Sequence, residues 1–136
     1  MTRKTRVLTN LELAVMNVVW GAGPEPMTVR DVAERLNAGS ERPLAYTTVQ
    51  TMMRILKEKG VLRSRPGPGR AHAFTTRLSR DDMTSTMVGD LVDRLFDGRA
   101  QPLLARLIDH DSVTRDELQR LKHLIQTQLD DEEDVR

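Results

Sequence analysis

Residues 46–76 read YTTVQTMMRILKEKGVLRSRPGPGRAHAFTT, and this stretch decides the fold. Its first part has apolar residues at positions i, i+3, i+4 and i+7, which are Val49, Met52, Met53 and Leu56. That spacing predicts a helix from about Thr47 to Lys59, closed by Gly60. Two short extended segments follow at 61–65 and 71–76, and the PGPGR sequence between them is typical of a turn. A helix is therefore followed directly by a β-hairpin.

Two more helices are predicted upstream of this stretch. Thr9 and Glu12 have the spacing of a capping box, so a helix begins near Thr9, and the Gly and Pro residues at 21–26 end it. A second helix begins at Thr28 and is followed by a turn at 37–43. Three helices and then a hairpin predict a winged helix-turn-helix over residues 1–78, in a chain that is mostly α with a small β-hairpin wing.

The second part of the chain returns to helical spacing after residue 78. Apolar residues recur every three or four positions in three segments, and Thr114 with Glu117 caps the last of them. Helices of this length cannot bury such stripes alone, so we expect a helical dimerisation segment at 79–129 and an acidic disordered tail at 130–136. The expected subunit contacts are Met87, Leu91, Leu95, Leu104, Leu107, Leu121 and Ile125.

The net charge of +1 hides a strong asymmetry. Residues 1–80 carry 14 Lys and Arg against 6 Asp and Glu, a net charge of +8, whereas residues 81–136 carry 7 against 14, a net charge of −7. Such an asymmetry arises either from chance segregation of solvated charge or from a polyanion-binding half. The charge alone leaves both interpretations open.

Several classes of function are disfavoured by the residue types. The chain has no cysteine, and its histidines, at 72, 110 and 123, lack the spacing of metal ligands. Pro66-Gly67-Pro68-Gly69 lacks the lysine and helix that follow in a phosphate-binding loop. We therefore expect no catalytic residues, no metal and no cofactor. No signal or membrane-spanning segment is recognised, which predicts a cytoplasmic protein without a membrane partner.

The third helix carries side chains suited to double-stranded DNA. Gln50 and Arg54 can read base edges, while Tyr46, Thr47, Thr48 and Thr51 can bond phosphates or contact thymine methyl groups. On a lone helix these would be ordinary exposed residues, but a basic hairpin follows this one. Contacts to the DNA backbone are expected from Arg63, Arg65, Arg70 and His72 on the hairpin, from Arg3, Lys4 and Arg6 at the N-terminus, and from Arg30. Trp20, Met52 and Met53 match the apolar stripes of the helices and are expected in the core, and Phe74 is expected to pack under the wing.

A family resemblance rests on five motifs within residues 8–129. They are LELAVMNVVW at 11–20, TVRDV at 28–32, YTTVQT at 46–51, Lys59-Gly60 and GRA at 69–71. Together they resemble the penicillinase-repressor family, the BlaI/MecI/CopY group. The resemblance implies a cytosolic winged-helix homodimer that represses promoters at dyad-symmetric operators, with Thr48, Gln50, Thr51 and the neighbourhood of Arg54 in the major groove and Arg70 at the wing.

Three departures from the family pattern affect what is carried over. Ile55 stands where members commonly have arginine, with Arg54 one place earlier. The absence of cysteine disfavours the copper sensing of one branch. The Asn-Phe pair cleaved in the β-lactam-responsive branch is replaced by Arg106-Leu107, so the inducing signal stays open, with proteolysis by a signalling protease as the implied route. The alternative function is a winged-helix protein-interaction module without DNA binding.

Overall fold

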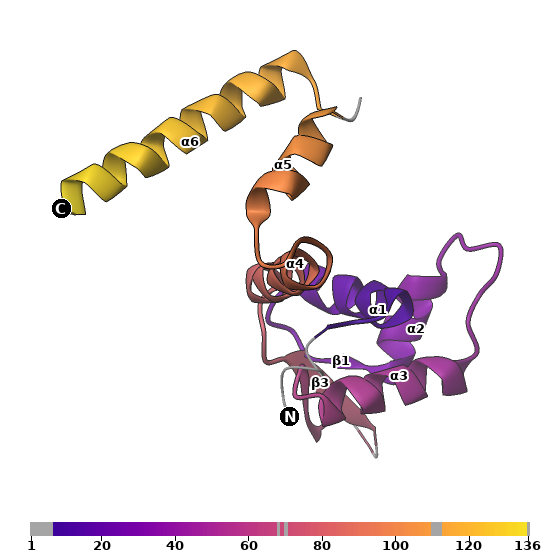
Figure 1. Ribbon diagram of the computed structural model, residues 1–136. Coiled ribbons are helices and arrows are strands. Elements are labelled where there is room, and N and C mark those ends of the chain that lie inside the picture. The colour runs from indigo at the N-terminus through magenta and orange to yellow at the C-terminus, as the bar shows by residue number, and fades with distance from the viewer. Residues whose placement is uncertain (1–6, 68, 70, 110–112, 136) are drawn as a thin grey trace. The chain divides into compact units, whose positions relative to one another are not determined.

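The computed structural model describes residues 7–67, 69, 71–109 and 113–135. It divides the chain into two compact units, Met1–Asp90 and Leu91–Arg136, and each is described by itself. The elements in chain order are α1 (Asn10–Gly21), β1 (Met27–Thr28), α2 (Val29–Asn37), α3 (Tyr46–Glu58), β2 (Leu62–Pro66), β3 (His72–Thr76), α4 (Arg80–Phe96), α5 (Ala100–Asp109) and α6 (Arg115–Val135) (Figure 1).

The first unit contains the three packed helices α1, α2 and α3. The predicted capping box of α1 is confirmed, and α2 begins with a second one. In α1 the Thr9 hydroxyl accepts a hydrogen bond from the Glu12 amide while the Glu12 carboxylate accepts one from the Thr9 amide, and Thr28 and Asp31 do the same in α2. After the C-terminal end of α3, Gly60 adopts a φ of 82°, a value that a residue with a side chain rarely adopts. Local signals therefore place all three helices.

The hairpin belongs to a three-stranded antiparallel sheet of order β1-β3-β2. Ser64 of β2 and Met27 of β1 both lie opposite Phe74 on the central strand β3. At the turn the Gly67 amide donates a hydrogen bond to the Ala71 carbonyl. Strand β1 was not predicted because two residues are too short to show an alternating pattern. Its pairing fixes the start of α2 against the wing.

The core of the first unit lies between the three helices and the sheet. Val15, Val49, Met53 and Leu56 are fully buried in it. Phe74 is 8% exposed, and Trp20 and Met52 pack against this core, so their predicted core positions are confirmed. The Trp20 indole N–H donates to the Leu78 carbonyl over 2.9 Å, which fixes the segment between β3 and α4.

The boundary between the units differs from the one expected after residue 78. The first part of α4 belongs to the first unit, because Met83 is 1% exposed and Met87 also packs against that core. Met87 was predicted at the subunit contact, and in the structure it is half-buried against the core of the first unit. The sequence pattern did not reveal this boundary because the apolar residues of α4 keep the same spacing of four throughout. Met83 and Met87 pack on the core of the first unit, whereas Leu91 and Leu95 are exposed.

The second unit consists of the end of α4, α5 and α6. Helix α4 ends at Phe96, and the two residues that follow, Asp97 and Gly98, both have positive φ. Residues 130–136 were expected to be disordered, but α6 continues to Val135. Extending an existing helix is easier than nucleating one, and Gln126 bonds Asp130 one turn further on. Among the described residues, none of the helices has the length and apolar character needed to cross a membrane.

Candidate nucleic-acid interface

The outer face of α3 collects the predicted base-reading side chains. Gln50 and Arg54 are exposed there, as are Tyr46, Thr47 and Thr51, whereas Thr48 is half-buried. The opposite face of the helix is the fully buried one described above, so α3 is anchored on its inner side. A helix held this way presents its outer side chains from a rigid support.

A groove of about 620 Å³ runs between α3, the start of α2 and the sheet. Its base includes the buried side chains of Val29 and Phe74, and Ser64 lies on the side of the hairpin. The remaining lining residues are polar or small, and they are Thr28, Arg30, Tyr46, Gln50, Arg54, Lys57, Ala71 and His72. The exposed face of α3 is therefore continuous with a hollow that reaches the wing.

Positive charge dominates the groove. Arg30, Arg54 and Lys57 reach it from α2 and α3, with His72 on β3, and none of the lining residues is acidic. The Arg54 guanidinium bonds Glu58 over 3.2 Å, but both side chains are more than 60% exposed. An exposed pair four residues apart on a helix contributes only about 0.3–0.5 kcal/mol, so an anion can compete for Arg54.

The residues that were predicted from the sequence to contact DNA divide into three groups. Arg30, Tyr46, Gln50, Arg54 and His72 meet at the groove. The others that the structure describes lie outside it on α3 and β2, and they are Thr47, Thr48, Thr51, Arg63 and Arg65. Arg3, Lys4, Arg6 and Arg70 lie outside the described residues.

Lys57 is a groove residue that the sequence reasoning missed. It follows Arg54 by three positions and Gln50 by seven, so helical spacing alone places it on their face. It was not predicted because it lies beyond the segment 46–54, which contains the predicted contact residues of this helix.

The start of α3 is fixed from outside the helix. Its N-cap is Ala45, which offers no side-chain hydrogen bond. Instead the Asn37 side chain donates to the Leu44 carbonyl over 2.9 Å and accepts from the Leu44 amide over 2.8 Å. This pair of bonds spans the turn between α2 and α3. No acidic residue occupies the first turn of α3, so its N-terminus keeps the positive end of the helix dipole available for phosphate.

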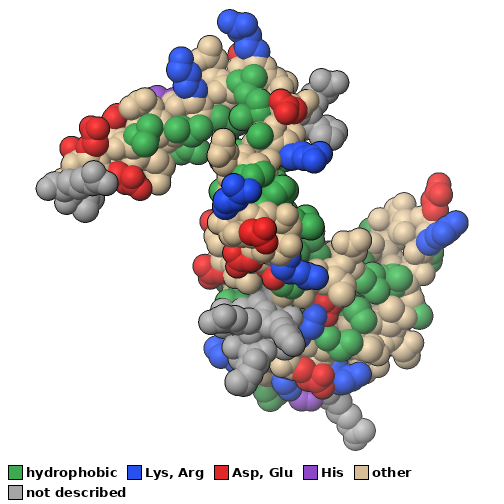
Figure 2. All heavy atoms as spheres, viewed as in Figure 1, with side chains coloured by type: hydrophobic (Ala, Val, Ile, Leu, Met, Phe, Trp, Pro, Cys, Tyr) green, Lys and Arg blue, Asp and Glu red, His purple; other side chains and the backbone are tan. Residues whose placement is uncertain are grey.

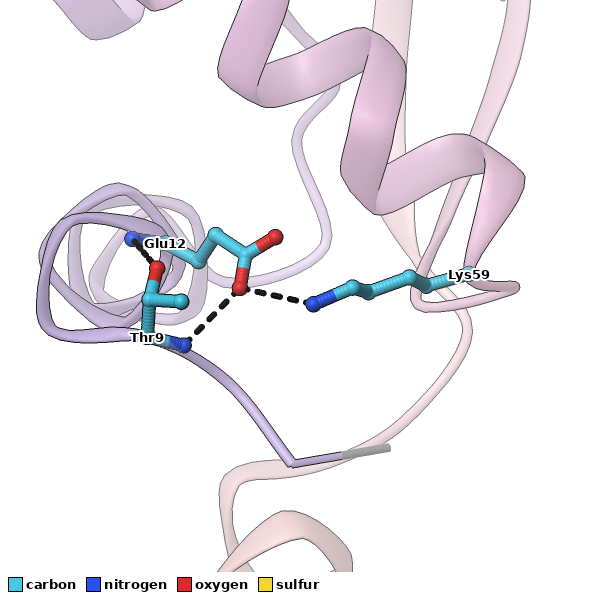
Figure 3. Close-up of polar contacts among 3 residues, drawn as sticks. All are labelled: Thr9, Glu12 and Lys59. Atoms are coloured by element: carbon cyan, nitrogen blue, oxygen red, sulfur yellow. Dashed lines mark hydrogen bonds and ion pairs between the residues drawn. The ribbon is translucent and has the colours of Figure 1, made fainter. Parts of the chain in front are cut away.

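The end of α3 is fixed by an ion pair with α1. The Lys59 ammonium donates to the Glu12 carboxylate over 2.8 Å, and the same oxygen accepts from the Thr9 amide over 2.8 Å (Figure 3). Burial raises the pKa of Glu12, but the hydrogen bonds from Lys59 and Thr9 outweigh burial and hold that pKa below its ordinary value of 4.5. Sequence analysis identified Glu12 as a capping residue only.

A second exposed surface lies on the helices of the second unit. Neither α5 nor α6 has a buried residue among those described. Figure 2 shows hydrophobic side chains gathered along α6. The large apolar residues exposed in this unit are Leu91, Leu95, Leu104, Leu107, Ile108, Leu118, Leu121, Leu124, Ile125 and Leu129. Exposed apolar residues in such number are typical of a surface that binds another protein.

The described residues offer little for metal chemistry. Within 7–67, 69, 71–109 and 113–135, no group of three His, Asp or Glu side chains is placed to hold a metal ion. His72 is exposed on β3 and His123 is exposed on α6, while His110 lies outside these ranges. The polar features that stand out are therefore the outer face of α3 and its groove.

Three helices with a three-stranded sheet, and a third helix exposed beside a hairpin, define a winged-helix protein. The chain belongs to the penicillinase repressor family, whose profile matches residues 8–127. The protein named "Transcriptional regulator BlaI" in Mycobacterium tuberculosis strain CDC 1551 / Oshkosh is 36% identical over 127 residues, covering 92% of this chain and 86% of the relative.

A relative of the same name in strain ATCC 25618 / H37Rv of that organism matches with the same identity and coverage. A solved structure described as the complex structure of hsRosR-S4 has a TM-score of 0.53 at 14% identity, covering 100% of both chains, and this likeness concerns the fold. The family and the relatives place the chain among BlaI-like transcriptional regulators.

Proposed function

We propose that the protein is a homodimeric repressor that binds a dyad-symmetric DNA operator through α3. The observation that carries the proposal is the outer face of α3, where Gln50 and Arg54 continue into a groove lined by Arg30, Lys57 and His72. The width of the DNA major groove admits an α-helix, and phosphates flank it on both sides. A polar helix face bordered by cations matches that arrangement.

The contacts divide by chemistry. Arg54 and Gln50 read base edges, because a guanidinium pairs with guanine and a carboxamide with adenine through two hydrogen bonds each. Thr47, Thr48 and Thr51 bond phosphates or contact thymine methyl groups beside them. Most of the backbone contacts come from long cationic side chains, which tolerate variation in position. They are Arg30, Lys57, Arg63, Arg65 and Arg70, with Arg3, Lys4 and Arg6 from the N-terminus. The His72 ring adds a further polar contact from the hairpin.

Dimerisation through the second unit supplies the two-fold symmetry. The exposed apolar residues of α5 and α6 need a cover, and a second copy offers the same surface in self-complementary form. Two copies of α3 then enter successive major grooves about 34 Å apart. The subunit contacts retained from the sequence are Leu91, Leu95, Leu104, Leu107, Leu121 and Ile125, all of them exposed in the single chain.

Derepression by an upstream signal, such as cleavage by a signalling protease, completes the proposal. By the family resemblance, the cleavage position corresponds to Arg106-Leu107, and both residues are exposed on α5. Cutting this helix separates α6 from the DNA-binding unit. The dimer is then lost, and with it the simultaneous binding of both half-sites.

An electrophoretic mobility shift with the protein's own promoter region tests DNA binding. We expect a retarded band that survives an excess of scrambled duplex. Absence of any retarded band at low salt would refute the proposal and favour a protein-interaction module. A band that scrambled duplex removes as efficiently as promoter duplex would refute specific recognition.

A further inference from the structure

Side chains from outside α3 hold this helix at both ends. At its start, Asn37 of α2 makes both hydrogen bonds to the backbone of Leu44, two residues before the helix begins. At its end, the C-cap residue Lys59 is bonded to Glu12 of α1. One contact ties the segment that leads into α3 to α2, and the other ties the end of α3 to α1, so the two contacts restrain both ends of the helix.

The contact with Glu12 stands out because of its burial. Glu12 is 3% exposed, and among the described residues it is the one charged side chain that is buried. One of its two carboxylate oxygens, Oε1, accepts hydrogen bonds from both Lys59 and the Thr9 amide. Glu12 therefore joins the first turn of α1 to the end of α3 (Figure 3). The lysine side chain is 20% exposed, so most of this ion pair is shielded from water.

A buried ion pair is a poor way to gain stability. The energy lost in removing two charges from water can exceed their attraction, and apolar replacements of similar volume are often neutral or stabilising. What an ion pair adds is direction, because its hydrogen bonds hold only over a narrow range of distance and angle. We call the Glu12–Lys59 pair and the Asn37 contact the two clamps of α3. The Glu12–Lys59 clamp therefore contributes more to the position of α3 than to the free energy of unfolding.

We propose that Asn37 and the Glu12–Lys59 pair are positioning residues that set the placement of α3 for base reading. The inference rests on the proposed function, in which α3 reads an operator. Base contacts through Gln50 and Arg54 require hydrogen-bond geometry, so a helix shift of about 1 Å breaks them. Phosphate contacts through flexible cations survive such a shift. Loss of the clamps therefore lowers sequence discrimination and leaves non-specific binding intact.

The test compares the full-length protein with two variants that keep the fold. Glu12→Gln with Lys59→Met removes the pair together, leaves no unpaired buried charge, keeps the net charge and retains an oxygen to cap Thr9. Asn37→Ala removes the clamp at the other end. The operator is selected by the wild type from random duplexes, and affinities for operator and scrambled duplex are measured below the unfolding transition, with folding checked by circular dichroism.

We expect the operator-to-scrambled affinity ratio to fall about tenfold for the double variant and less for Asn37→Ala, with scrambled affinity within about twofold of wild type. Met83→Ala serves as the control, because it removes a buried side chain of the same unit at a distance from the α3 ends in sequence. This control variant should have a lower melting temperature than the wild type and the same operator-to-scrambled affinity ratio.

Two outcomes overturn the inference while leaving the proposed function standing. They are an unchanged ratio in the double variant, and an equal fall of the ratio in the Met83→Ala control. If the wild type selects no duplex over random sequence, the proposed function fails first and this inference fails with it.

Discussion

The two units of the chain use apolar side chains in opposite ways. In the first unit, Val15, Met53 and Leu56 are fully buried, whereas in the second unit Leu95 is 68% exposed and Leu124 is 59% exposed. The same helical spacing occurs in both. Periodicity therefore predicts that a helix has an apolar face, but only the structure shows whether the same chain covers it. The first unit has its own core, whereas the large apolar residues of the second unit stay exposed in the single chain.

The largest expected effect concerns where the first unit ends. A protein truncated after Asp90 keeps Met83 and Met87 and should unfold cooperatively, whereas one truncated after Ser79 loses both. Removing a buried methionine side chain costs about 2–5 kcal/mol, so the shorter fragment should be much less stable. Thermal and urea unfolding followed by circular dichroism measures the difference. Equal stability of the two fragments would show that α4 is not part of this core.

The next effect concerns the cover of the second unit. Ile125→Lys places a charge on the exposed apolar face of α6, and two-fold symmetry doubles it at the subunit contact. We expect a monomer by sedimentation velocity and an operator affinity about 100-fold weaker, because the coupling between half-sites is lost.

Thr127→Lys is the matched control, since it adds the same charge to an exposed polar position two residues along, on the opposite face of the same helix. It should remain dimeric. Dimers of equal stability in both variants would place the subunit contact elsewhere.

A smaller effect separates base reading from phosphate binding within the first unit. Arg54→Ala should cost about 1–3 kcal/mol on the operator and little on scrambled duplex. Lys57→Ala should weaken both duplexes about equally and lower the slope of log affinity against log salt by about one. Titrations at several salt concentrations give both quantities. An operator-to-scrambled ratio that Arg54→Ala leaves unchanged would assign base reading to other residues.

The smallest effect is a pH dependence of stability. Because the pKa of Glu12 is lowered in the folded protein, its ionised form stabilises the fold fully above about pH 4.5, and this contribution is lost as the pH falls through the lowered pKa. The Glu12→Gln variant has no carboxylate at this position and therefore lacks this pH-dependent contribution to stability. Urea unfolding at about pH 6 and about pH 3 should therefore show a larger loss for the wild type than for the variant. Equal losses would mean that the ion pair with Lys59 does not hold the proton off Glu12.

Sequence analysis predicted the helices and the hairpin because their signals are local. Thr9 with Glu12, and Thr28 with Asp31, are three positions apart and satisfy the backbone of one turn. By contrast, β1 is two residues long and forms only because β3 lies beside it. A pairing between strands that far apart in sequence leaves no periodicity to detect.

The same distinction applies to the site. Tyr46, Gln50 and Arg54 could be predicted because helical spacing places them on one face of α3. The clamp between Glu12 and Lys59 joins residues 47 positions apart, and a buried carboxylate looks like any other capping glutamate in the sequence. Asn37 likewise resembled an ordinary turn residue. Long-range polar contacts of this kind depend on packing, which no local pattern encodes.

In the proposed function the two units cooperate, since one reads DNA and the other joins two copies. The most direct measurement is the affinity of the full-length protein for a dyad operator and for the same duplex with one half-site scrambled. We expect binding about 100-fold tighter to the intact dyad, with two protomers per duplex. Equal affinity for the two duplexes would contradict it, because two copies of α3 would not be reading the DNA together.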